Sequence, residues 1–323
     1  MSRLGYARRS YGYAVGRVLV LESKIMSAAR LDRLAHASTL REQLKVLAET
    51  EYAPWLAHAD DRESITEGID RRVGAALELL EDSRAEDIAR FFRMWRDFTN
   101  IKVALARDRG EAEPAFSGLG TVPVDAWEAG GLPRWLEDEL TSAREVAAEK
   151  GPAQAAAGMD RRRLEARVEA ARRLKDGLAI ELARLDIDMA NVRLVVRGAA
   201  KEDLMPGGAA KPADVVDKFA GEGPRGLAGL IVGGLRDVGW PEGDEQGSGP
   251  AAWGGMDRLE ALGARVQLAL ARQGRLRTTT SQPVVAWMAA VEAEARLVSL
   301  MVLGRMDGVS EALVKDRVAT VHG

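Results

Sequence analysis

Two short segments of the sequence share an acidic residue, an asparagine three positions later and a basic residue two positions after that. They are RDFTNIKVAL (96–105) and IDMANVRLVV (187–196), which place these side chains at Asp97, Asn100 and Lys102 and at Asp188, Asn191 and Arg193. An acid, an amide and a base that lie close together can ligate a metal, move a proton or bind a partner. The repetition therefore raises three interpretations: a catalytic or metal site, a partner surface, and a structural joint.

The helical spacing of these side chains favours the structural joint. Residues three apart are neighbours on a helix, so Asp97 and Asn100 face the same side. An asparagine inside a helix is about 0.6 kcal/mol less favourable than alanine, so its use in both copies indicates a hydrogen bond that is made twice. We interpret Asn100 and Asn191 as joints that satisfy a backbone group of a crossing helix. A partner surface is the alternative, and catalysis or metal binding is the third interpretation.

A weaker third copy occurs in VEAEARLVSLMVLGR (291–305). There Glu294 takes the place of the aspartate, Leu297 replaces the asparagine and Ser299 replaces the base. The third copy has therefore lost two of its three polar side chains. We expect that the three corresponding units do not contact partners equivalently.

No other residue pattern in the chain indicates chemistry. The sequence has no cysteine, which excludes disulfides, thiolate nucleophiles and Cys-ligated zinc. The three histidines are isolated from carboxylates at ligand spacing, and no phosphate-binding glycine loop or nucleophile elbow is present. The arginine-rich run at 160–175 alternates with glutamate, which is typical of a solvated helix face, and contact with an acidic partner is the alternative. We predict no cofactor, no metal site and no small-molecule substrate, and the sequence argues against an enzyme.

The composition limits the class of protein further. The chain has 323 residues, with 46 Lys and Arg against 49 Asp and Glu and a net charge of −3. A nucleic-acid-binding protein needs a basic surplus to replace the counterions of phosphates, so no nucleic-acid partner is expected. No apolar stretch reaches the roughly 18 residues of a membrane span. No signal peptide is recognised at the start, and we expect a cytoplasmic protein.

The elements that must position these residues are predicted to be helices. Ala, Leu, Arg and Glu are frequent, and apolar residues recur at a helical period. The helices are predicted over 11–26, 84–107, 160–197, 281–308 and 309–321, the last with Ser310 as its cap. The segment 160–197 is one long helix or two helices that separate near Gly177, and Ser281 is a plausible cap. The predicted fold class is all-α.

Three breaks rich in Gly and Pro divide the chain, at 108–123, 198–213 and 239–255. The first two follow directly after the two copies, so each copy is expected to close a structural unit. A second repetition, between residues 40–55 and 227–242, supports this division. We predict three helical subdomains, whose approximate bounds are 1–110, 111–205 and 206–323.

Five segments in order carry a resemblance to a known family. They are YGYAVGRVLVLESKIM (11–26), the pattern L-x-x-T-x-Y at Leu47, Thr50 and Tyr52, the two copies, and the tail VEAEARLVSLMVLGRMDGVSEALVKDRV (291–318). Together they resemble the C-type rotor component of the archaeal and bacterial V/A-type rotary ATPases (ATP synthases), whose counterpart in the eukaryotic V-ATPases is of the d type. The resemblance covers essentially the whole chain.

The resemblance implies a funnel of three related helical subdomains with approximate threefold pseudo-symmetry. Its wide face would sit on the membrane rotor ring, and its central socket would receive the central-stalk subunits of the D and F types. Such a component has no catalytic or nucleotide site. It lies on the cytoplasmic side, peripheral to the membrane through the rotor ring, and transmits torque for proton or sodium transport.

Two other functions are weighed against this expectation. A soluble helical-repeat scaffold with an unrelated protein partner would stack its units as an open superhelix. A helical enzyme would need a constellation of strongly shifted carboxylates in an apolar cleft.

Overall fold

The all-α prediction is confirmed, because the regular elements in the described part of the chain are helices and no strand is present. The computed structural model describes residues 11–111, 115–232, 256–310, 314–315 and 318. The glycine-rich break at 239–255 and most of the helix predicted after Ser310 lie outside these residues. Within the same ranges, every helix is too short or too polar to cross a lipid bilayer.

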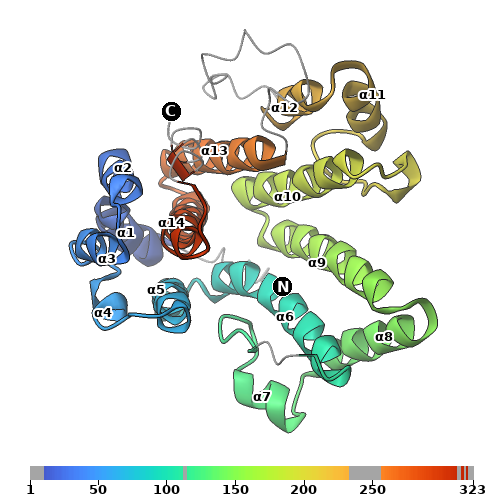
Figure 1. The fold of residues 1–323 in the computed structure, drawn as a ribbon, viewed down its shortest axis with the longest axis horizontal. Coiled ribbons are helices and arrows are strands. Elements are labelled where there is room, and N and C mark those ends of the chain that lie inside the picture. Colours follow the sequence, from blue (N-terminus) through green and yellow to red (C-terminus); the bar gives the residue numbers. More distant parts are fainter. Residues whose placement is uncertain (1–10, 112–114, 233–255, 311–313, 316–317, 319–323) are drawn as a thin grey trace, which may run out of the picture.

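Six of the described helices pack side by side in a closed ring, which we call the helix ring (Figure 1). In ring order they are α5 (Arg62–Asp82), α6 (Glu86–Asp108), α9 (Pro152–Leu174), α10 (Gly177–Val196), α13 (Met256–Arg275) and α14 (Gln282–Met306). Each helix contacts the next, and α14 packs back against α5. This closure differs from the open superhelix of a stacked-repeat scaffold. The threefold pseudo-symmetry of the funnel stays a prediction.

Shorter helices lie around the outside of the helix ring (Figure 1). Near α14 and α5 they are α1 (Gly12–Leu21), the 3-10 helix η1 (Glu22–Lys24), α2 (Ala28–His36), α3 (Leu40–Leu47) and α4 (Ala53–Leu56). Near α6 and α9 they are α7 (Val124–Ala129) and α8 (Arg134–Lys150). Near α10 and α13 they are η2 (Lys201–Asp203), α11 (Pro212–Glu222) and α12 (Pro224–Val232). The first of these groups brings the N-terminal part of the chain against its last long helix.

The long segment 160–197 forms two helices, and its local sequence explains the break. Lys175 adopts a left-handed conformation with φ of 54°, which ends α9. The next residue, Asp176, accepts a hydrogen bond from the backbone N–H of Ala179 at 3.0 Å and caps α10. Ser281 makes no such capping bond for α14, which corrects the expected cap. Its hydroxyl donates a hydrogen bond to the Asp176 carboxylate, and this bond joins the starts of α10 and α14.

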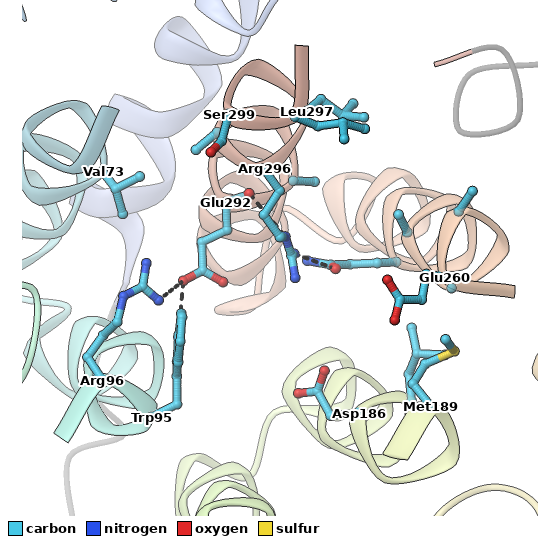
Figure 2. Close-up of a pocket in the computed structure, with 18 of the residues that line it drawn as sticks. Val73, Trp95, Arg96, Asp186, Met189, Glu260, Glu292, Arg296, Leu297 and Ser299 are labelled. Carbon is cyan, nitrogen blue, oxygen red and sulfur yellow. Dashed lines mark hydrogen bonds and ion pairs between the residues drawn. The ribbon is translucent and has the colours of Figure 1, made fainter. Parts of the chain in front are cut away.

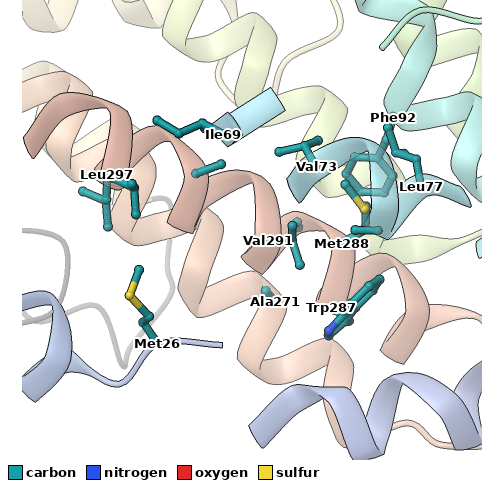
Figure 3. Close-up of a cluster of buried hydrophobic side chains, with 14 of the residues drawn as sticks. Met26, Ile69, Val73, Leu77, Phe92, Ala271, Trp287, Met288, Val291 and Leu297 are labelled. Carbon is teal, nitrogen blue, oxygen red and sulfur yellow. The ribbon is translucent and has the colours of Figure 1, made fainter. Parts of the chain in front are cut away.

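The main hydrophobic core surrounds α14 (Figure 3). Met288 and Val291 of this helix are completely buried. Val73 and Leu77 of α5 and Phe92 of α6 belong to the same core. A helix that is apolar on nearly all sides is stable in water only when other elements enclose it. The sequence of α14 therefore explains why this helix is covered by α5 and α13 within the helix ring and by the N-terminal helices outside it.

The predicted subdomain bounds fall in connections of this fold. The bound at residue 110 follows α6, and the bound at residue 205 lies in the loop after α10. The division into three subdomains stays a prediction.

Candidate functional site

The first copy of the repeated segment lies on α6 and holds the loop that follows this helix. The buried Asn100 donates from Nδ2 to the carbonyl oxygen of Ser117 at 3.0 Å, and the N–H of Ser117 donates to Asn100 Oδ1 at 2.8 Å. Asp97 accepts the N–H of Thr121 at 2.9 Å and its hydroxyl at 2.6 Å. A Cβ atom at Gly120 would collide with Asp97 Oδ1, so this glycine permits the close approach.

The second copy makes the same arrangement on α10. Asn191 donates to the carbonyl oxygen of Met205 and accepts its N–H, both at 2.8 Å. Asp188 accepts the backbone N–H groups of Ala209 at 2.9 Å and Ala210 at 3.2 Å. A Cβ atom at Gly208 would again collide with the aspartate. We call each of these Asp and Asn pairs, with the loop that it binds, a loop clamp.

In both loop clamps the asparagine binds the loop after its own helix, and not the backbone of a crossing helix, where we expected its partner. The physical reason is that backbone groups within a helix already bond to one another, whereas those of a loop need other partners. The two copies lie on different helices of the helix ring, with α9 between them in ring order. The structure thus places Asp97 with Asn100, and Asp188 with Asn191, at two separate sites.

The third copy lies on α14 and has a different partner. Glu294 is 4% exposed, and its carboxylate accepts the backbone N–H of Met26 from the N-terminal part of the chain. Leu297, which stands at the asparagine position, is buried in the main core. Burial raises the pKa of Glu294, although the Met26 N–H and the charge of Arg72 act in the opposite direction.

Burial also perturbs the two aspartates of the loop clamps. It raises the pKa of Asp97 to about 6, although the hydrogen bonds from Thr121 oppose the shift. It likewise raises the pKa of Asp188 to about 6 against the N–H groups of Ala209 and Ala210. A buried carboxylate prefers its neutral form because charge is poorly solvated there. Burial in a structural clamp accounts for these shifts without a catalytic role.

The basic residue of each full copy forms an ion pair with the next helix of the helix ring. Lys102 Nζ lies 2.6 Å from Asp160 of α9, and Arg193 Nε lies 3.2 Å from Glu260 of α13. Both pairs are partly exposed to solvent. Exposed pairs of this kind contribute little to stability.

A cavity of about 440 Å³ lies inside the helix ring and is lined by residues of all six of its helices (Figure 2). Its charged lining residues are Asp70, Arg96, Arg163, Arg167, Asp186, Arg193, Glu260, Glu292 and Arg296. In the described ranges, no group of three or more histidine and acidic side chains is arranged to hold a metal ion. The cavity is therefore a charged, arginine-rich recess, and we take it as the candidate functional site.

One wall of the cavity is built around Arg96 of α6. Its guanidinium carbon lies 3.4 Å from the centre of the Trp95 ring, and its Nη1 lies 3.8 Å from Glu292 Oε1 of α14. Trp95 Nε1 donates to the same carboxylate oxygen at 3.4 Å (Figure 2). Burial lowers the pKa of Arg96, and the charge of Glu292 acts against this shift.

The neighbouring wall is built by α9 and α10. Arg167 Nε lies 2.6 Å from Asp186 Oδ2, and the Arg167 side chain is 9% exposed. The guanidinium carbon of Arg167 also lies 4.5 Å from the centre of the Phe91 ring. The ion pairs of the cavity therefore join helices that are neighbours in the fold.

Arg193, chosen from the sequence, lines the cavity. Sequence reasoning missed the other lining residues, although the repeated segment contained a signal for three of them. Trp95, Asp186 and Glu292 each stand two positions before the acid of their copy, and all three line the cavity. The shared register places them on one face of three helices of the helix ring. The acids and asparagines chosen from the sequence turn instead toward the loops and the N-terminal segment.

One protein-family model matches nearly the whole chain. The model of the family described as ATP synthase (C/AC39) subunit matches residues 14–317, which include the helix ring and all three copies of the repeated segment. A search of the curated proteins found no match. The resemblance recognised from the five sequence segments is thus confirmed at the level of the family. The chain belongs to the ATP synthase (C/AC39) subunit family.

Proposed function

We propose that the chain is a non-catalytic rotor subunit of a V/A-type ATPase, which links the central stalk to the membrane rotor ring and transmits torque for proton or sodium transport. Membership of the family supports a place in the rotary complex. The observation that carries the finer proposal is the closed helix ring around a charged cavity. A closed ring offers a socket for an axial shaft, whereas an open superhelix does not.

The packing of the helix ring suits a part that transmits torque. Its helices are long and lie side by side, and the nearly all-apolar α14 is buried between its ring neighbours and the N-terminal helices. Close-packed interiors have low compressibility and transmit strain. Under a twisting load, such an element turns as one body and loses little of the rotation to internal deformation.

In this proposal the partners are protein subunits, with no nucleic acid and no small-molecule substrate. The lower end of the D- and F-type stalk subunits enters the cavity, and one end of the helix ring rests on the rotor ring. The chain is then peripheral to the membrane on its cytoplasmic side. ATP chemistry belongs to other subunits, and the charged residues of the cavity act by contact.

Affinity purification from membranes in a mild detergent tests the assembly. The tagged chain is expected to carry with it both the stalk subunits and the rotor-ring subunit. Recovery of neither, in conditions that keep the rest of the complex together, would overturn the proposed function.

A charge reversal in the cavity tests the coupling. In the complete complex, Glu260→Lys is expected to leave ATP hydrolysis active but to reduce ion pumping severalfold, because the stalk loses a contact in the socket. The double variant Arg193→Glu/Glu260→Lys keeps the internal ion pair and is expected to stay uncoupled. The matched control is Glu67→Lys, since Glu67 forms an exposed ion pair with Arg71 elsewhere on α5. Full coupling in both cavity variants would contradict the proposal.

A further inference from the structure

The walls of the cavity have the same register but different chemistry. The position two residues before the acid of each copy is Trp95 on α6, Asp186 on α10 and Glu292 on α14. One wall therefore presents a neutral indole, and two present carboxylates. An occupant of the cavity meets different groups on each side, so the charges around the wall indicate what kind of occupant fits.

The charges of the lining residues do not balance. The cavity has five arginines and four carboxylates among its lining residues. Arg96, Arg167 and Arg193 each lie within 4.0 Å of a lining carboxylate, and Arg163 lies 4.0 Å from Asp160 of its own helix, which does not line the cavity. Asp70 makes no such pair in the described residues, although its charge acts on Arg96. For Arg296 the described part of the chain provides no carboxylate within that distance. Its Nη2 donates to the Gln267 amide oxygen at 2.6 Å, and its Nε donates to the carbonyl oxygen of Glu292 at 3.3 Å.

Arg296 belongs to a group of arginines that repel one another. Burial is the main cause that lowers the pKa of Arg96; the charges of Arg296 and Arg167 act in the same direction, and those of Glu292 and Asp70 act against it. All three arginines line the cavity. Among the buried nitrogens of the cavity, Arg96 Nη1 and Arg163 Nε make no hydrogen bond. Buried donors in folded proteins are nearly always satisfied, by protein, by water or by a bound group. This wall therefore offers both spare positive charge and spare N–H donors.

A carboxylate is the group that this wall would recognise. Arginine presents N–H donors in a planar fork that matches the two oxygens of a carboxylate, and the bond is stronger where water is excluded. Such a contact would also relieve the repulsion among the three arginines. Neighbouring Trp95 and Ala293 keep the wall partly apolar, which suits a side chain on a protein surface.

We propose that the stalk element that enters the cavity presents an acidic side chain to Arg96, Arg167 and Arg296. The inference rests on the proposed function and adds the chemistry and the position of the stalk contact. The acid binds at the α6, α9 and α14 wall, off the axis of the helix ring. One side of the socket thus holds the stalk more strongly than the others do.

Binding of the purified full-length chain to the purified stalk complex tests this proposal. Arg296→Gln is expected to weaken the affinity about tenfold or more, because a charge-assisted bond contributes more than about 1.4 kcal/mol. Arg296→Lys keeps the charge and is expected to retain most of the affinity. The affinity of the wild-type chain should also fall more steeply with salt than that of Arg296→Gln.

Arg71→Gln is the matched control, because it makes the same change at an exposed arginine of α5 that pairs with Glu67 and does not line the cavity. It is expected to bind the stalk as the wild type does. Equal binding by Arg296→Gln and the wild type, with the same salt dependence, would overturn the acidic contact and leave the socket itself standing. A wild-type chain that does not bind the stalk complex would instead overturn the proposed function. Thermal melting of each variant separates a binding defect from unfolding.

Discussion

The copies of the repeated segment on α10 and α14 are used in different ways. At α10, Asp188 and Asn191 bind the loop that directly follows the helix. At α14, Glu294 binds the backbone of Met26, and Leu297 fills the asparagine position. The first contact joins neighbouring parts of the chain, and the second joins its N-terminal part to its last long helix.

This difference shows which contacts of the fold form within a short stretch of sequence and which require distant parts of the chain to pack together. A loop clamp brings together residues close in sequence, so little chain entropy is lost when it forms. The contact between Glu294 and Met26 requires that α1, α2 and α3 already pack on α14. A single longer acid suffices there, because the apolar contacts of α14 position the N-terminal helices. The loop clamps should therefore be independent units, and the third contact should report on the packing of the N-terminal helices against α14.

Removal of a clamp asparagine is the strongest way to break this comparison. Asn191→Ala is expected to lower the free energy of unfolding by about 4 kcal/mol, since the N–H and the C=O of Met205 both lose a buried partner. Asn100→Ala should behave alike, because Ser117 loses the same two bonds. Urea unfolding measures the change. Leu297→Asn makes the reverse change in the third copy and should also lower the free energy of unfolding, because an amide would enter the apolar core. A neutral Asn191→Ala would contradict the structural role.

The pH dependence of stability provides the next largest effect. The folded-state pKa of Asp97 and of Asp188 is about 6, above the ordinary value of 3.8, so the folded chain binds more protons between these values. Its free energy of unfolding therefore falls as the pH rises from about 4 through about 6, by roughly 2 kcal/mol per aspartate. Urea unfolding between pH 4.5 and 7.5 measures this slope.

Asp188→Asn isolates one of the two titrations. The variant should lose its share of the slope, whereas an exposed Asp138→Asn should keep the full slope. Asparagine resembles the neutral carboxyl, so the two curves should converge at low pH, and the wild type should fall below the variant as the pH rises through about 6. Parallel curves for Asp188→Asn and the wild type would show that this carboxyl does not titrate as its burial requires.

Removal of Glu294 tests the third contact. Glu294→Ala is expected to cost about 2 kcal/mol, because the buried N–H of Met26 loses its acceptor. Hydrogen exchange should then rise in α2 and around Met26, while the loops held by Asn100 and Asn191 stay protected. Glu294→Gln keeps an acceptor oxygen and should stay close to the wild type. Uniform exchange throughout the chain after Glu294→Ala would show that the third contact is no more separate than the loop clamps.

The sequence predicted the helical elements of this comparison well. The helix expected over 84–107 is α6, which has a clear apolar period and Gly110 beyond its end. The one expected over 281–308 is α14, which is apolar along nearly its whole length, with Pro283 in its first turn and Gly308 beyond its end. The polar register of Asp97 and Asn100 was also visible. Their partners were not, because Ser117 and Thr121 lie in a loop, where no period indicates which backbone group faces a helix.

The contacts between distant parts of the chain could not be predicted from local sequence patterns. The contact between Glu294 and Met26 depends on the packing of whole helices, which no spacing of residues encodes. The cavity residues Trp95 and Arg96 lie in α6, and their sequence pattern did not distinguish them from the other apolar and charged residues of this helix. Only the shared position of Trp95, Asp186 and Glu292 connects them, and that position gains meaning once the helices are known to surround one cavity.

Removal of the basic residue of a copy is expected to have the smallest effect on stability, and it tests whether this residue belongs to the loop clamp. Lys102→Ala and Arg193→Ala are each expected to change the free energy of unfolding by less than about 1 kcal/mol, because their ion pairs with Asp160 and Glu260 are partly exposed. High salt should reduce even this difference, because the Debye length falls from about 10 Å in about 0.1 M salt to about 3 Å in about 1 M salt. Urea unfolding at these two salt concentrations measures the effect. The third copy already has Ser299 at this position and still packs α14 into the core. A loss above about 2 kcal/mol in either variant would make the base a part of the clamp, together with the acid and the amide.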